Sequence, residues 1–184
     1  MRHPLQQLPE GERLRAFVPL LALTLGVMTV LNFVDLPLRN VAAPWGVVSF
    51  EFAGSVEKAR AILDSWDGTA RMRATFGLGF DHLFIFAYSL TIALGCVGTS
   101  GLLRKHRPVI ARAGLPLAWG AWMAGVLDMT ENASLFTMLL NNPTSPWPQV
   151  AWWAAAVKFL LVLAGIVYMV LGAALGLLRT TEWR

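Results

Sequence analysis

Residues 114–140 read GLPLAWGAWMAGVLDMTENASLFTMLL, an apolar run interrupted by two acidic side chains. The run is long enough to form a helix that crosses a hydrocarbon core of about 30 Å. Asp128, Glu131 and Asn132 fall at positions i, i+3 and i+4, so a helix places all three on one face. Ionisable groups inside hydrocarbon are costly and usually face a bundle interior or a wet cavity, where they carry function. This stretch therefore predicts a transmembrane helix with a polar site inside it.

Three further apolar runs are long enough to span a membrane, and they cover residues 16–36, 76–103 and 150–178. The composition agrees, because 56% hydrophobic and 14% charged residues depart from the globular average of about a quarter charged. The connections between the runs leave no room for a second domain. We therefore expect residues 1–184 to form one all-α domain, a polytopic membrane protein built as a four-transmembrane-helix bundle.

The connection between the first and second spans, residues 37–75, has a helical pattern of its own. Ser55 can cap a short amphipathic helix. Its apolar face consists of Val56, Ala59, Leu63 and Trp66. Such a helix suits the membrane surface or the roof of the bundle. It is either a lid over a site or a solvated joint between two spans.

Basic residues set the expected orientation. They precede the first span, fill residues 104–112 and follow the fourth span, whereas residues 141–149 carry no charge. By the positive-inside rule, both termini are cytoplasmic. Membrane lipids as partners account for the net charge of +4, so nucleic-acid binding is not needed to explain it. The richness in Ala, Leu, Gly and Arg favours a bacterial inner membrane.

Polar groups from several spans reach one level in the outer half of the membrane. At a rise of about 1.5 Å per residue, Asp81 lies about 8 Å from the outer end of its span, Lys158 about 12 Å and Asp128 about 18 Å. Lys158 shares a stripe with the small residues Gly165 and Gly172, which allow close helix approach, so its ammonium should point inward. A pair between Lys158 and either Asp128 or Asp81 leaves at least one carboxylate over. Two carboxylates close together in a low dielectric do not both ionise easily.

These residue types in one pocket predict ligand binding with acid/base chemistry. Glu131 or Asp128 would be the acid/base group, with Asp81 as its partner and Lys158 controlling the charge. Further ligand-binding candidates at this level are Asp35, His82, Tyr88 and Asn132.

Structural roles compete with these assignments. Asp35 can cap the end of its span, and His82 can be a hydrogen-bonded histidine at the membrane interface. Lys158 and its partners can form a polar network that fixes the register of the helices.

The sequence predicts no metal site and no cofactor. A di-iron site in a bundle would need several histidines beside its carboxylates, and His82 is the histidine at membrane depth. A haem would need an axial histidine, which His82 could supply, but nothing else marks a porphyrin pocket. The single cysteine, Cys96, excludes an internal disulfide.

Residues 32–35 read NFVD and residues 80–84 read FDHLF, so one acidic residue closes the first span and another opens the second. Together with the long connection between them, this pattern resembles the four-helix emopamil-binding-protein and sigma-two-receptor superfamily over residues 28–98. Members of that superfamily hold sterol-like or amine ligands in an intramembrane pocket, and some isomerise a sterol double bond by proton transfer. The resemblance implies a comparable pocket here. The Asp-x-x-Glu-Asn pattern that begins at Asp128 is instead similar to uncharacterised four-span bacterial proteins.

Three functions remain open at this point. The leading one is binding of a small hydrophobic or lipid-like ligand, with proton transfer to it. The second is proton-coupled transport or relay through the same carboxylates, which predicts a homodimer because four spans are few for a transporter. The third is an accessory subunit of a larger membrane complex, in which the polar cluster is structural.

Overall fold

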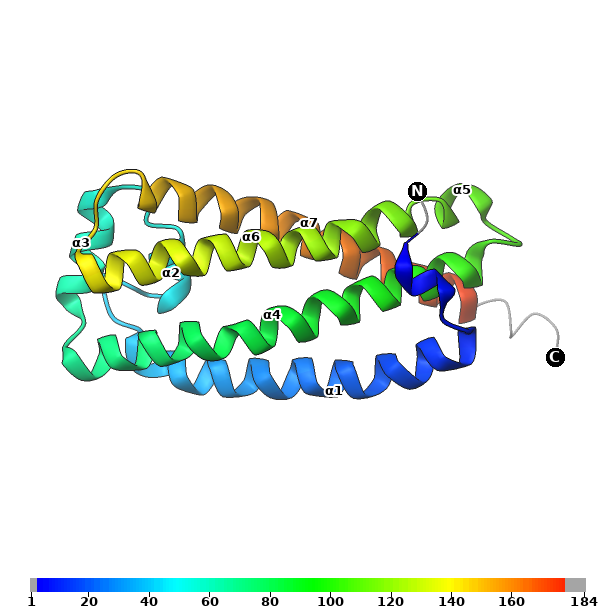
Figure 1. The fold of residues 1–184 in the computed structure, drawn as a ribbon, viewed down its shortest axis with the longest axis horizontal. Coiled ribbons are helices and arrows are strands. Elements are labelled where there is room, and N and C mark those ends of the chain that lie inside the picture. The colour runs from blue at the N-terminus through cyan, green and yellow to red at the C-terminus, as the bar shows by residue number, and fades with distance from the viewer. Residues whose placement is uncertain (1–2, 178–184) are drawn as a thin grey trace. The chain divides into compact units, whose positions relative to one another are not determined.

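The computed structural model describes residues 3–177. Its elements in chain order are η1 (Pro4–Gln7), α1 (Glu10–Asp35), η2 (Leu36–Leu38), α2 (Val47–Glu51), α3 (Val56–Ser65), α4 (Gly68–Leu103), α5 (Pro108–Ala111), α6 (Gly114–Asn141) and α7 (Trp147–Leu177). Four spans containing α1, α4, α6 and α7 are long and apolar enough to cross a membrane (Figure 1). The predicted all-α fold with four spans and short helices between the first two is therefore confirmed.

Three of the long helices begin before the apolar runs do. α1 begins at Glu10 instead of residue 16, α4 at Gly68 instead of 76, and α7 at Trp147 instead of 150. The apolar run marks the part of a helix that suits lipid, whereas the backbone hydrogen bonds continue into polar flanks. At α4 the Asp67 side chain accepts a hydrogen bond of 2.7 Å from the Ala70 N–H, which starts the helix there. The predicted end of the fourth span, residue 178, lies outside the described residues.

The chain packs as two compact units, each containing a part of every long helix. Unit 1 comprises Met1–Thr24, Ala87–Gly125 and Phe159–Arg184. Unit 2 comprises Leu25–Phe86 and Val126–Lys158. The organisation as one domain stays a prediction.

Small and polar side chains bring the helices of unit 1 together. A Cβ added at Gly172 of α7 would overlap the Thr99 side chain of α4, so the predicted close approach along this stripe is confirmed. The Thr24 and Thr91 hydroxyls share a hydrogen bond of 3.0 Å that joins α1 to α4.

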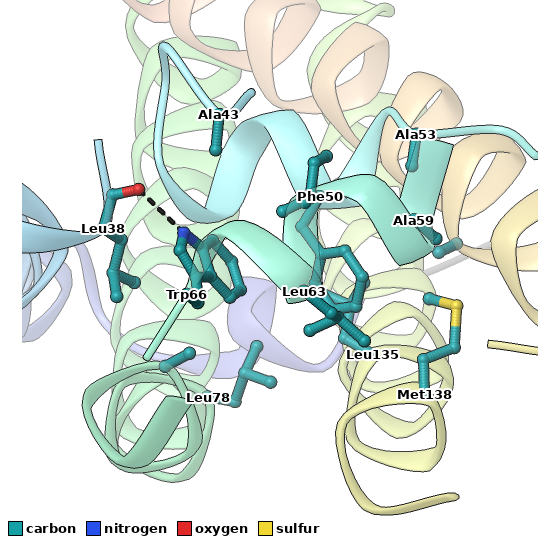
Figure 2. Close-up of a cluster of buried hydrophobic side chains, with 13 residues drawn as sticks. Leu38, Ala43, Phe50, Ala53, Ala59, Leu63, Trp66, Leu78, Leu135 and Met138 are labelled. Carbon is teal, nitrogen blue, oxygen red and sulfur yellow. Dashed lines mark hydrogen bonds between the residues drawn. The ribbon is translucent and has the colours of Figure 1, made fainter. Parts of the chain in front are cut away.

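In unit 2, the connection between α1 and α4 is a packed cap. Phe50 of α2 and Trp66 after α3 meet edge to face with ring centroids 5.6 Å apart. The Trp66 indole N–H donates a 2.8 Å hydrogen bond to the Leu38 carbonyl (Figure 2). Leu135 of α6 lies in the same buried cluster. The predicted amphipathic helix is α3, and Ser55 caps it by accepting from the Lys58 N–H at 3.3 Å. α3 therefore packs against the end of the helices in unit 2, as the predicted roof of the bundle.

Candidate functional site

Lys158 lies at the centre of a buried charged cluster in unit 2. Its ammonium donates a 2.8 Å hydrogen bond to Asp128 Oδ1 and lies 2.7 Å from Glu131 Oε2. A third carboxylate, Glu51 Oε2, lies 3.9 Å from the same ammonium. The side chains of the four residues are between 0% and 9% exposed. We call these four residues the Lys158 cluster.

Helical spacing accounts for the contribution of α6. Asp128, Glu131 and Asn132 are all buried, whereas Met129 and Thr130 between them are exposed. The predicted common face of the two acidic residues is thus confirmed, and it is the face turned toward Lys158.

Glu51 is the member of the Lys158 cluster that the sequence analysis missed. It ends α2, in the connection between the first two spans, and it is 7% exposed. The residues around it read VVSFEF over 47–52, an apolar stretch inside an otherwise charged connection. That isolated acidic residue between two phenylalanines was the available signal, because a lone charge in an apolar helix is usually paired when it is buried.

Asp35 determines where α2 begins. Its Oδ1 accepts a 2.7 Å hydrogen bond from the Val47 N–H, and its Oδ2 accepts a 3.0 Å hydrogen bond from Arg39 Nε. The structure therefore places Asp35 at the start of α2, whose last residue is Glu51. The predicted contact of Asp35 with a ligand stays a prediction.

Asp81 joins α4 to α6 through an amide. Asn132 Nδ2 donates a 2.7 Å hydrogen bond to Asp81 Oδ2, and Asp81 is only partly buried. Asn132 is 2% exposed and is adjacent to Glu131 in the chain. Two predicted site residues are thus brought together, and they extend the charged region of unit 2 toward α4.

The remaining predicted ligand-binding residues are His82 and Tyr88. His82 is exposed, and its Nδ1 lies 3.0 Å from the Leu78 carbonyl of its own helix. Tyr88 is buried and belongs to unit 1.

The Lys158 cluster holds more acidic groups than its ammonium can neutralise. Three ionised carboxylates around one ammonium would leave excess negative charge in a buried site. Glu51 lies outside the spans, and burial raises its pKa to about 7, against the lowering effect of Lys158. Glu131 Oε1 is buried and has no hydrogen-bond partner among the described residues. A proton shared between the carboxyl groups accounts for the raised pKa of Glu51 and gives Glu131 Oε1 a hydrogen-bond partner.

The placement of possible metal ligands follows from the same geometry. Among residues 3–177, no group of three His, Cys, Asp or Glu side chains is placed to hold a metal ion. An ammonium already occupies the point on which the three carboxylates of the Lys158 cluster converge.

The chain matches no family model, no curated protein and no solved structure. The resemblance of residues 28–98 to the emopamil-binding-protein superfamily is thus supported by no family match. Fold and site together define a polytopic membrane protein with a buried charged cluster.

Proposed function

We propose that this membrane protein binds a small hydrophobic or lipid-like molecule and exchanges a proton with it at the Lys158 cluster. The observation that carries the proposal is the acidic surplus: Glu51, Asp128 and Glu131 surround one ammonium and are all buried. A structural ion pair needs one carboxylate for one ammonium. The additional buried carboxylates cost stability, and such groups are typical of sites that hold or transfer protons.

Each residue has a distinct part in this proposal. Glu131 is the acid/base group, because it is the most deeply buried of the three carboxyl groups and lies 2.7 Å from the Lys158 ammonium. Lys158 holds the Asp128 carboxylate in position through their 2.8 Å hydrogen bond. Glu51 supplies or receives the proton, because its pKa of about 7 lets it change charge near neutral pH.

A screen by thermal shift tests the proposal. Hydrophobic amines, sterol-like compounds and phospholipids are added to the purified protein in detergent, and the melting temperature is measured. A true ligand should stabilise the wild type and fail to stabilise Glu131→Gln, which keeps the shape of the side chain but cannot exchange a proton. The matched control is Asp64→Asn, since Asp64 is a 70% exposed carboxylate on α3 that should leave the response unchanged.

The result that would contradict ligand binding is a screen in which no compound distinguishes the wild type from Glu131→Gln. The accessory-subunit interpretation would then lead, because it needs the Lys158 cluster only for stability.

The position of Glu51 favours proton relay as a second candidate function. Glu51 comes from the connection outside the spans, whereas Asp128 and Glu131 lie within α6, so the cluster extends from the end of unit 2 into a span. Carboxylates in such a row can pass a proton along. Proton flux into liposomes that Glu131→Gln abolishes, measured with a pH-sensitive dye, would favour relay over ligand chemistry.

A further inference from the structure

Directly after α2, unit 2 contains a cavity of about 300 Å³ that the Lys158 cluster does not line. Three aromatic residues line it, namely Phe52, Trp152 and Trp153. The rings of Phe52 and Trp152 are perpendicular with centroids 6.2 Å apart, and those of Trp152 and Trp153 lie 4.7 Å apart. Rings packed edge to face hold one another in place, so they form a stiff apolar wall.

Gly54 allows the chain to fold against this wall. Its φ is +68°, a conformation that side chains other than that of glycine rarely adopt. A Cβ at this position would also lie 3.3 Å from Trp152 Cδ1. The contact between the connection and α7 is therefore built for close approach.

The polar part of the lining is positive. Lys58 and Gln149 line the cavity, and none of the described lining residues is acidic. Lys58 is exposed and no ion pair to it is described, whereas Arg71 of α4 lies 3.8 Å from Asp64 of α3. An ammonium and an amide N–H beside aromatic rings suit an anionic oxygen on an amphipathic molecule.

We propose that this cavity binds the phosphate head group of an anionic membrane phospholipid. A volume of about 300 Å³ is at the small end of ligand sites and suits a phosphate head group. The tail has an apolar path along α7, where Trp153 and Val157 are 65% and 41% exposed and one helical turn apart. Tryptophans at this position also suit the boundary between membrane and water.

The same site identifies anionic phospholipids as the substrate class of the protein, an inference that rests on the proposed function. Phe52 follows Glu51 in the chain, and Trp152 precedes Lys158 on α7 by about 9 Å of helical rise. A head group in the cavity thus lies within two helical turns of Lys158 along α7.

The test measures retention of short-chain phosphatidylglycerol by the purified protein in detergent, using native mass spectrometry across a lipid titration. The wild type should retain one lipid molecule. Lys58→Gln, which removes the ammonium, should weaken retention by about tenfold. Arg60→Gln is the matched control, because Arg60 is an exposed cation on the same helix and does not line the cavity.

Three further arms separate the alternatives. Phosphatidylcholine should be retained more weakly than phosphatidylglycerol, and soluble glycerol phosphate, which lacks the tail, should compete only at concentrations far above that of the lipid. Equal retention of the two lipids, glycerol phosphate competing as well as the lipid does, or equal loss in Lys58→Gln and Arg60→Gln would each overturn the proposal. Asp64→Asn, which changes an exposed carboxylate on the helix that carries Lys58, should retain phosphatidylglycerol as the wild type does. Retention is measured without proton exchange, so it can fail or succeed independently of the thermal-shift screen.

Discussion

Glu51 connects the stability of the protein to pH. Burial raises its pKa from 4.5 to about 7, so the folded protein holds this proton more tightly than an unfolded chain does. The stabilisation from that proton is complete below pH 4.5 and is lost as the pH rises through about 7. Glu51→Gln keeps the neutral form at every pH. Its melting temperature in detergent should therefore fall less than that of the wild type between these two pH values.

A neighbouring acidic residue provides a control of opposite sign. Glu57 is exposed, and hydrogen bonds from its own backbone and from Ser55 lower its pKa. Its contribution to stability is present at neutral pH and is lost as the pH falls through the lowered pKa. Glu57→Gln should keep the wild-type decline toward pH 7. Melting curves of Glu51→Gln that parallel the wild type over this window would contradict the role of Glu51.

Lys158 should be the residue on which the fold of unit 2 depends most. Lys158→Met leaves the carboxylates of the cluster without their cation, and breaking a buried ion pair typically costs about 3–5 kcal/mol. The double variant Lys158→Met, Asp128→Asn removes one of those charges and should recover part of the lost free energy of unfolding. Denaturation in detergent measures the free energy of unfolding of the single and the double variant, with Lys105→Met as an exposed control. A single variant as stable as the wild type would show that the ion pairs contribute nothing.

At the scale of elements, the apolar pattern predicted the long helices better than their beginnings. Hydrophobic runs show which residues suit lipid. The start of α4 is instead marked by a hydrogen bond to the polar side chain of Asp67, which lies outside the apolar run. The face of α6 that carries Asp128, Glu131 and Asn132 was predictable because helical periodicity alone fixes it.

The short helix α2 was the part of the candidate site that the sequence could not supply. Five residues carry too little periodicity to identify a helix, and the position of α2 depends on the distant Asp35 side chain. The pairing of Glu51 with Lys158 is likewise a contact between residues far apart in the chain. A prediction based on span patterns therefore found the three residues of the Lys158 cluster that lie inside the spans. It missed Glu51, which lies in the connection outside them.

For the whole molecule, the charge pattern predicts which loops face the cytoplasm. Thr144 lies in the uncharged connection between α6 and α7, and Lys105 lies in the basic connection between α4 and α6; both are exposed. In intact spheroplasts, a cysteine at Thr144 should react with an impermeant thiol reagent, and one at Lys105 should react only after permeabilisation. The wild type serves as the blank, because its Cys96 is buried. Labelling in the reverse order would invert the orientation.

The charges of α6 also bear on how the chain enters the membrane during synthesis. α6 leaves the ribosome before α7, so Asp128 and Glu131 reach the insertion machinery before Lys158 has been made. An acidic residue near the centre of a lone inserting helix costs about 2.5–3.5 kcal/mol. The span that contains α6 is also the least apolar of the four, whereas the span that contains α7 is the most apolar. We therefore expect α6 to partition into the lipid together with α7, as a hairpin whose second helix brings both the hydrophobicity and the cation that the first one lacks.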